Sequence, residues 1–334
     1  MSRPGARPVA MLTNPIHLQP LARLQQRAEV RLAPATDAET LTRVAAGADV
    51  IIVRAPLPAA ALSASPRLRG VIRHGAGVDL IPVDEASRLG VAVANVPQAN
   101  AVSVAEYVLG QMLALTHRLR QVDATLRAEG WPAARALADG STEVAGKVVG
   151  IVGLGAIGAE VARMCREGLR ARVLGTRRSD APMPPGVQAV PLPELFAAAD
   201  VVVLACPLDD STRGLVGAPL LARMKRGAFL INVSRGPVVD EPALVEALRS
   251  GALGGAALDV FAQQPLPASS PLLAMPHVIL SSHLAGITED SMRRMGEGAV
   301  DQALQLLAGE LPRHWVNTQA DAAIRARLAQ LGCA

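Results

Sequence analysis

Three glycines stand at a spacing that suits phosphate binding. The segment reads Gly153-Leu154-Gly155-Ala156-Ile157-Gly158 and directly follows the apolar run 148–152. A G-x-G-x-x-G sequence that ends a strand and opens a helix is typical of a dinucleotide-binding turn. The first glycine allows the tight turn, the second lets backbone amides approach a pyrophosphate, and the third lets helix and strand pack closely. The helix N-terminus faces the anion. We therefore expect residues 153–158 to bind a dinucleotide; a glycine-rich turn without a ligand is the alternative.

The residues after the next predicted strand bear on which dinucleotide binds. NAD-preferring sites place a carboxylate about 20 residues beyond the glycines, where it accepts hydrogen bonds from the ribose. This chain has Thr176-Arg177-Arg178 there, and Asp180 lies too far along to take that role without a rearranged loop. Because guanidinium groups grip phosphate bidentately, we expect NADP as the preferred cofactor and NAD as the second candidate. The alternative is two solvated arginines beside a site that does not discriminate.

Further short motifs occur in order around this glycine loop. They are His74-Gly75-Ala76-Gly77-Val78-Asp79, Ser103-Val104-Ala105-Glu106, Asn232-Val233-Ser234-Arg235-Gly236, Val239-Asp240-Glu241, Leu258-Asp259-Val260-Phe261 and Ser282-His283-Leu284-Ala285-Gly286. In this order they resemble the D-isomer-specific 2-hydroxyacid dehydrogenase family, including its hydroxypyruvate/glyoxylate reductases and short phosphoglycerate dehydrogenase-like members. The resemblance covers about residues 50 to 300. It implies an α/β fold of two Rossmann-like, doubly wound parallel-sheet domains with the active site in the cleft between them.

The resemblance also implies which part of the chain binds the substrate and which part binds the dinucleotide. Residues 1–98 and 289–334 would form the substrate domain, and residues 99–288 the inserted dinucleotide-binding domain. A homodimer would form largely through the cofactor domain and residues 100–145. The expected enzyme is an NAD(P)-dependent 2-hydroxyacid dehydrogenase, or 2-ketoacid reductase. It would transfer a hydride between NAD(P)H and a small anionic 2-keto or 2-hydroxy acid of the D-isomer type.

Individual residues receive roles from the same resemblance. Arg235 would clamp the substrate, and His283 would act as acid and base. A 2-keto acid needs a bidentate cation for its carboxylate and carbonyl oxygens, and a proton donor for the alkoxide that forms. Taken alone, Arg235 in a turn would more often be a surface residue, and His283 after a strand would more often be structural.

The other expected site residues fall into two groups. The substrate carboxylate would be held by the loop Gly75, Ala76 and Gly77. The cofactor surroundings would include Ser103, Cys206, Pro207, Val233 and Asp259, with Asn100 nearby. Arg54, before Ala55-Pro56, either binds an additional anionic group of the substrate or caps a strand. We expect no metal site.

One position departs from the family pattern. The family has a third catalytic residue, a Glu, in the stretch Asp-Val-Phe-x-x-Glu-Pro, whereas this chain reads Asp259-Val260-Phe261-Ala262-Gln263-Gln264-Pro265. Gln264 therefore takes the Glu position. A Glu would stabilise imidazolium and raise the pKa of His283, whereas Gln can orient the ring without supplying a charge. With a pKa of about 6.5, His283 would be mostly neutral at pH 7, and keto-acid reduction should weaken above neutrality.

This Gln–His pair leaves three interpretations, in the following order. The first is a 2-ketoacid reductase with a changed pH profile. The second resembles the family's NAD-dependent formate dehydrogenases, where such a pair suits direct hydride abstraction from formate; the short chain and the basic loop at 176–178 argue against it. The third is a non-catalytic, nucleotide-sensing protein like the family's corepressors, which the presence of both Arg235 and His283 argues against.

The elements that must position these residues alternate along the chain. Strands are predicted at 8–12, 49–53, 68–73, 90–94, 147–152, 172–175, 199–204, 228–233, 254–259 and 278–281. Helices are predicted at 18–28, 37–46, 158–168, 192–198, 217–226, 241–250 and, as the final one, 289–309. Residues 100–127 predict one or two helices, and residues 128–145 predict a loop. Short apolar strands that alternate with helices indicate parallel sheets.

The composition limits the number of domains, the class of partner and the location that we expect. The 334 residues suggest two domains, and an apolar half with only 2% aromatics suits strands buried on both faces. The net charge of +4 comes with dispersed Arg residues, so we expect no nucleic-acid partner. Cys165, Cys206 and Cys333 lack metal-binding spacing and predict reduced thiols. Residues 1–13 lack an apolar signal core and no segment is long enough to span a bilayer, so we expect a soluble cytoplasmic protein without a membrane partner.

Overall fold

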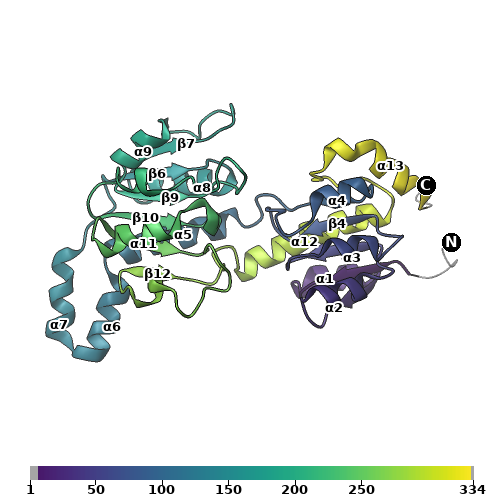
Figure 1. Ribbon diagram of the computed structural model, residues 1–334, viewed down its shortest axis with the longest axis horizontal. Helices are drawn as coiled ribbons and strands as arrows, with labels where there is room; N and C mark the ends of the chain where they lie inside the picture. The colour runs from purple at the N-terminus through teal and green to yellow at the C-terminus, as the bar shows by residue number, and fades with distance from the viewer. Residues whose placement is uncertain (1–6, 332–334) are drawn as a thin grey trace. The chain divides into compact units, whose positions relative to one another are not determined.

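Two separate parallel sheets organise the chain, and each belongs to one of two units (Figure 1). The computed structural model describes residues 7–331. Unit 1 contains the described residues up to Asn100 and from Ile287 onward, and unit 2 contains Ala101–Gly286.

The sheet of unit 1 has five strands in the order β2-β1-β3-β4-β5. These strands are β1 (Val9–Leu12), β2 (Glu29–Leu32), β3 (Val50–Val53), β4 (Gly70–Arg73) and β5 (Ala92–Ala94). The helices are α1 (Leu18–Gln25), α2 (Ala38–Ala45), α3 (Ala59–Ser63), α4 (Val83–Arg88), α12 (Glu289–Leu307) and α13 (Asp321–Gln330). The helix α12 packs against α1, β3 and β4.

Alternating side chains of the strands build a core on each face of this sheet. In β1, Val9 and Met11 join a cluster with residues of α2, α3 and α4. Ala10 and Leu12 point to the opposite face and join residues of α1, α12 and α13. Successive strand residues face opposite sides of a sheet, so one short apolar strand serves both cores.

The outer strand β5 of this sheet is covered by a return of the chain. An isolated antiparallel bridge joins Ala94 to Trp315. The Val316 amide donates to the Val93 carbonyl at 2.7 Å, and the Val93 amide donates to the Asn317 side chain at 2.9 Å. The segment 314–317 thus satisfies the backbone groups that an outer strand leaves open.

The sheet of unit 2 has seven strands in the order β12-β11-β10-β9-β6-β7-β8, all parallel. The strands are β6 (Val148–Val152), β7 (Arg172–Thr176), β8 (Val187–Ala189), β9 (Val201–Leu204), β10 (Ala228–Asn232), β11 (Leu253–Leu258) and β12 (Val278–Leu280). The helices are α5 (Ala101–Thr116), α6 (Leu119–Glu129), α7 (Trp131–Ala136), α8 (Ala156–Glu167), α9 (Leu192–Ala198), α10 (Ala218–Leu221) and α11 (Glu241–Arg249).

Helices cover both faces of this second sheet as well. One core contains residues of α5 and α8 together with Ile231, and the other contains residues of α9, α10 and α11 together with Leu230. The predicted fold class, two doubly wound parallel-sheet α/β units of Rossmann type, is confirmed. In a parallel sheet the carboxyl ends of all strands meet at one edge, where ligands bind in such folds.

Three predictions about the elements were wrong. Residues 128–145 are not one loop, because α7 and a short 3-10 turn, Leu137–Gly140, occupy part of them. Pro132 lies in the first turn of α7, where its missing N–H costs nothing. The helix predicted at 217–226 is shorter, since α10 covers only Ala218–Leu221. The helix α12 is not the final one, because α13 follows it.

Two kinds of feature are absent from the described residues, a membrane-spanning helix and a metal-binding cluster. No helix between residues 7 and 331 is long and apolar enough to cross a membrane. No group of three or more His, Cys, Asp or Glu side chains in that range could hold a metal ion. Cys165 and Cys206 are buried and free. Cys333 and the first six residues of the N-terminal stretch lie outside the described residues.

Candidate active site

The glycine loop connects β6 to α8 at the carboxyl edge of the sheet of unit 2. Gly153 has a φ of +94°, and its amide donates to the carbonyl of Thr176, the last residue of β7. A Cβ on Gly153 would lie 2.6 Å from the Cα of Cys206, just beyond β9. A Cβ on Gly158 would overlap the Gly153 carbonyl. Both positions therefore require glycine, one for its backbone angle and both for close packing.

Gly155 differs from its two neighbours in the motif. Within residues 7–331, nothing lies within 4 Å of the position that its Cβ would take. It is the N-cap of α8 and makes no side-chain cap, so the amides of Ala156, Ile157 and Gly158 begin the helix. Such first-turn amides have no partner within the helix and attract anions. Open space beside them fits the pyrophosphate of a dinucleotide.

The two arginines of the basic loop after β7 have different partners. Arg177 donates from Nε to the Ser179 hydroxyl at 3.0 Å and from Nη1 to the Pro182 carbonyl at 2.9 Å. Arg178 forms an ion pair with Asp209, in the segment after β9, at 2.9 Å. Both arginines lie at the same edge as the glycine loop, because Thr176 ends β7 beside it.

Other predicted cofactor residues surround this edge. Cys206 and Pro207 follow β9, and burial raises the pKa of the Cys206 thiol. Val233 follows β10, and its amide donates to the Leu204 carbonyl at 3.2 Å. Ser103 is buried in the first turn of α5. Asn100, the residue before α5, is the boundary residue of unit 1.

Asp259, predicted near the nicotinamide, organises the segment that carries His283. Its Oδ1 accepts from the Ser281 hydroxyl at 2.6 Å and the Leu284 amide at 2.8 Å, and its Oδ2 accepts from the Ala285 amide at 3.0 Å. The His283 amide donates to the Asp259 carbonyl at 2.8 Å. His283 has a φ of +56°, a conformation that L residues rarely adopt. The buried carboxylate holds the backbone around it.

Tyr107 of α5 adds a contact that the sequence did not reveal. Its hydroxyl lies 2.5 Å from the Ser281 hydroxyl. Ser281 has one hydroxyl proton and donates it to Asp259, so Tyr107 must be the donor to Ser281. Burial raises the pKa of Tyr107, which keeps that proton in place.

The structure brings Arg235, Gln264 and His283 onto neighbouring segments of unit 2. A Cβ on Gly236 would overlap the Phe261 carbonyl, so the segment after Arg235 touches the one that leads to Gln264. The Nδ1 of His283 lies 3.3 Å from the Oε1 of Gln264. Arg235 precedes a 3-10 turn and donates from Nη1 to the Ser234 carbonyl at 2.8 Å.

Glu241 also braces this region, which sequence reasoning missed. Its Oε2 accepts from the Ala262 amide at 3.1 Å, two residues before Gln264. The only sequence signal for it was the motif Val239-Asp240-Glu241, which does not show which backbone group the carboxylate binds.

The predicted substrate loop, residues 75–77, lies at the carboxyl edge of the sheet of unit 1, directly after β4. Gly75 has a φ of +136°, and its amide donates to the Arg73 carbonyl at 2.9 Å. The Arg73 guanidinium donates to the carbonyls of Val53, His74 and Gly77 at 2.7–3.1 Å. Asn95 donates to the Ala76 carbonyl at 2.6 Å. Side chains thus occupy the carbonyl oxygens of Ala76 and Gly77. The backbone groups that this loop can offer to a ligand are therefore its N–H donors.

Two basic side chains beside this loop are buried to different degrees. His74 is buried, and neither of its ring nitrogens has a hydrogen-bond partner among the described residues. Burial, with Arg54 and Arg73 adding, lowers its pKa to about 3, so the ring is neutral at working pH. Arg54 donates from Nη1 to the Pro15 carbonyl at 2.5 Å, and burial lowers its pKa.

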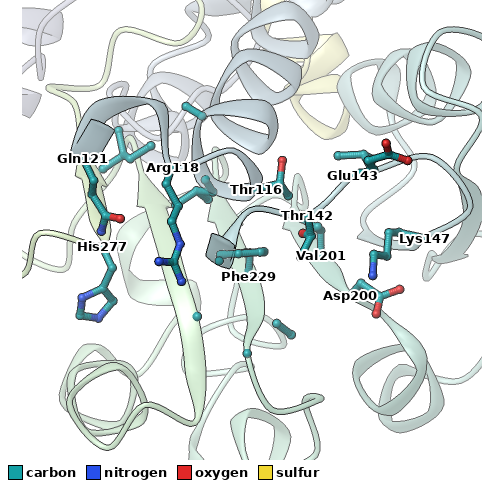
Figure 2. A pocket seen from close by; sticks show the side chains of 18 of the residues that line it. Thr116, Arg118, Gln121, Thr142, Glu143, Lys147, Asp200, Val201, Phe229 and His277 are labelled. Atoms are coloured by element: carbon teal, nitrogen blue, oxygen red, sulfur yellow. The ribbon is translucent and has the colours of Figure 1, made fainter. Parts of the chain in front are cut away.

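A cavity of about 520 Å³ lies at the opposite edge of the sheet of unit 2 (Figure 2). It is bordered by residues that precede strands, such as Lys147 before β6 and His277 before β12, and by Arg118 and Gln121 beside or in α6. The glycine loop and His283 follow strands instead. This cavity is therefore separate from the candidate active site.

Comparisons with known proteins bear on the family of this chain. Residues 109–285 match the family model described as D-isomer specific 2-hydroxyacid dehydrogenase, NAD binding domain. A glyoxylate reductase of Korarchaeum cryptofilum is 34% identical over 94% of this chain and 97% of its own length. The chain belongs to the D-isomer specific 2-hydroxyacid dehydrogenase family. The predicted enzyme class, an NAD(P)-dependent oxidoreductase of this family, is thereby confirmed.

Further relatives extend the comparison. A D-3-phosphoglycerate dehydrogenase of Mycobacterium leprae is 35% identical over 93% of this chain, but the match spans only 59% of that relative. The structure of an NADPH-dependent glyoxylate/hydroxypyruvate reductase from Sinorhizobium meliloti has a TM-score of 0.82 at 29% identity, covering 93% of this chain and 98% of that one. The fold is thus similar to that of the S. meliloti reductase over 93% of this chain.

Proposed function

We propose that this enzyme reduces a small 2-keto acid, such as glyoxylate or hydroxypyruvate, to the D-2-hydroxy acid with NADPH. The observation that carries the proposal is the grouping of Arg235, Gln264 and His283 in unit 2. The full-length similarity to a glyoxylate reductase supports the substrate class. Phosphorylated or sulfonated hydroxy acids are compatible with the same residues.

The chemistry follows from what each side chain can do. The bound cofactor supplies the hydride. The Arg235 guanidinium binds the carboxylate and carbonyl oxygens of the keto acid and stabilises the negative charge that develops on the carbonyl oxygen. We further propose that the amides of Ala76 and Gly77 in unit 1 bind a carboxylate, since the Gly75 amide is already bonded to Arg73. Arg54 lies in the same unit and remains a candidate for an additional anionic group.

Gln264 determines which ring nitrogen of His283 handles the proton. The Oε1 atom of Gln264 can only accept, so the Nδ1 atom 3.3 Å away carries a hydrogen. The Nε2 atom is then the one that gains a proton and delivers it to the substrate oxygen. Because Gln264 supplies no charge, the pKa of His283 should be lower than a Glu partner would make it. Reduction should therefore weaken as pH rises above neutrality.

The variant Gln264→Glu tests this account. A carboxylate beside Nδ1 should raise the pKa of His283 and move the fall of kcat/KM for glyoxylate or hydroxypyruvate to higher pH, by about one unit. The matched control is Gln263→Glu, which adds the same charge one residue earlier. The pH profile is measured for both with NADPH. An unchanged profile in Gln264→Glu, or an equal shift in the control, would remove the role given to Gln264.

The Gln264–His283 pair also favours a second candidate, direct hydride abstraction from formate. That reaction releases no proton to a general base, so a neutral orienting partner would suffice. Formate-dependent production of NAD(P)H without keto-acid reduction would replace the first proposal with this one. If the enzyme catalyses neither reaction but binds the dinucleotide, the nucleotide-sensing interpretation takes its place.

We propose NADP as the preferred cofactor because Arg177 and Arg178 follow β7 without a carboxylate beside them in sequence. The NADPH-dependent reductase of S. meliloti shares the fold, which supports this choice. Fluorescence titration with NADPH and NADH decides, and a clear preference for NADH would contradict the proposal.

We also propose a homodimer through the region of residues 100–145. The two helices α6 and α7 pack on each other and project as a hairpin from unit 2 (Figure 1). Their apolar side chains Leu119, Leu126 and Trp131 are exposed, Trp131 by 72%, as expected of a contact surface. Sedimentation of the protein checks this; a monomer at micromolar concentration would contradict it. A cytoplasmic location is a further proposal, which rests on the sequence.

A further inference from the structure

A carboxylate stands beside the basic loop, although it lies far from that loop in sequence. The Oδ2 of Asp209 is 2.9 Å from the Nη1 of Arg178. The same Nη1 donates to the Ser211 hydroxyl at 2.5 Å. This ion pair joins the segment after β7 to the segment after β9, and β6 with its glycine loop lies between those strands in the sheet.

Local hydrogen bonds fix the Asp209 carboxylate in this position. Its Oδ1 accepts from the Ser211 amide at 2.9 Å and from the Ser211 hydroxyl at 2.6 Å. The Thr212 hydroxyl donates to the Pro207 carbonyl at 2.8 Å and accepts from the Asp209 amide at 2.8 Å. Ser211, with Arg178 adding, lowers the pKa of Asp209 to about 2. The carboxylate is charged whenever the enzyme works.

Arg177 has partners of a different kind. It donates to a hydroxyl, that of Ser179, and to a carbonyl, that of Pro182. Among the described residues, no ion pair involves its guanidinium. The two consecutive arginines are therefore not equivalent, because only Arg178 is neutralised by a carboxylate.

We propose that Asp209 is a specificity-determining residue that lowers the preference of the enzyme for NADP over NAD. This inference rests on the proposed binding of a nicotinamide dinucleotide at the glycine loop. Asp209 holds Arg178 and leaves Arg177 as the main cation for a 2′-phosphate. It also supplies the carboxylate that the end of β7 lacks, which can accept hydrogen bonds from ribose hydroxyls.

The charges of the two cofactors make the proposal specific. The 2′-phosphate of NADP is an anion, so a fixed carboxylate nearby repels it and competes with it for Arg178. NAD has a hydroxyl at that position, which donates to a carboxylate. Asp209 should therefore weaken NADPH binding and strengthen NADH binding relative to an uncharged residue.

The variant Asp209→Asn tests this effect on cofactor preference, because it removes the charge with little change of side-chain shape. The side-chain oxygen of Asn can still accept from Ser211, so the turn should remain. We expect the ratio of the Kd for NADH to the Kd for NADPH to rise about fivefold, the upper range for one exposed ion pair. The matched control is Asp210→Asn, because Asp210 is the exposed neighbour of Asp209 and forms no ion pair among the described residues. An unchanged ratio, or the same change in the control, would overturn the proposal.

A double-mutant cycle then identifies Arg178 as the intermediary. Arg178→Ala should change NADPH binding little in the unmodified chain, where Asp209 holds that arginine. In the Asp209→Asn background it should abolish the gain in NADPH affinity. Equal effects of Arg178→Ala in both backgrounds would show that the two residues act independently and would overturn the mechanism.

Binding is titrated by fluorescence without keto acid, which separates this proposal from the function. Binding of both dinucleotides with the expected shift, but without keto-acid reduction, contradicts only the proposed reaction. Reduction with an unchanged ratio of Kd values contradicts only the role of Asp209. A chain that binds neither dinucleotide overturns both.

Discussion

Each unit has a glycine loop at the carboxyl edge of its sheet, but the two loops hold their backbones in different ways. The loop of unit 2, residues 153–158, runs directly into α8. The loop of unit 1, residues 75–77, is followed by α4 only from Val83 onward. The first therefore presents the amides of a helix N-terminus, whereas the second depends on Arg73 and Asn95, which bind its carbonyl oxygens.

The difference shows that strand topology alone does not set the capacity of a loop for anions. A helix N-terminus adds the partial charge of the helix dipole to several amides, which suits the two charges of a pyrophosphate. A loop held by side chains offers one or two amides, which suits a single carboxylate. Both loops use glycine, but for different reasons. Gly158 allows close packing against the Gly153 carbonyl, and Gly75 allows a φ of +136°.

The largest effect should come from Gly158→Ala. The new Cβ would overlap the Gly153 carbonyl, so the loop and α8 must move apart. We expect a loss of about 3 kcal/mol of unfolding free energy, measured by urea denaturation. Gly155→Ala is the control, because its Cβ meets open space. Equal stability of the two variants would show that the close contact at Gly158 is not important to the fold.

Gly155→Ala should instead affect the ligand. Its stability should stay within about 1 kcal/mol of the unmodified chain, but its methyl group would lie in the space assigned to the pyrophosphate. We expect the Kd for NADPH to rise about tenfold or more, measured by fluorescence titration. Unchanged affinity would place the pyrophosphate elsewhere.

The smallest effect should come from the loop of unit 1. Arg73→Gln removes the clamp on three carbonyls and should raise the KM for the keto acid about fivefold, while the Kd for NADPH stays constant. If Arg73→Gln weakens folding, Asn95→Ala provides a milder variant, since it removes only the bond to Ala76. A parallel rise in the Kd for NADPH would argue that residues 75–77 do not act on the substrate alone.

Periodicity predicted most of the fold, and its failures have physical causes. The outer strands β2 and β8 were missed because they are short and carry exposed polar residues, such as Glu29 and Gln188. Strands at the edge of a sheet need fewer apolar side chains. The helix α13 was missed because its large apolar residues are few; Ile324 and Leu328 are its buried residues.

The candidate site was predicted in part, and the missing part consists of long-range pairs. The glycine motif and the ordered family motifs pointed to the residues that would touch cofactor and substrate. They could not show that Tyr107 contacts Ser281, 174 positions away, or that Asp209 pairs with Arg178. Such pairs depend on which strand ends and helices become neighbours in the fold, and this arrangement is not written in any single motif.

The segment 314–317, which covers β5, has a consequence for solubility. An exposed outer strand is a template for pairing with another chain, and proteins protect such strands to avoid aggregation. Here the protection comes from a part of the chain more than 200 residues after β5. A chain cut after α12 would keep every residue assigned to the chemistry but would expose backbone groups of Val93 and Asn95. The defect of such a chain would then be aggregation, in which the exposed outer strand pairs with another molecule, rather than loss of catalysis.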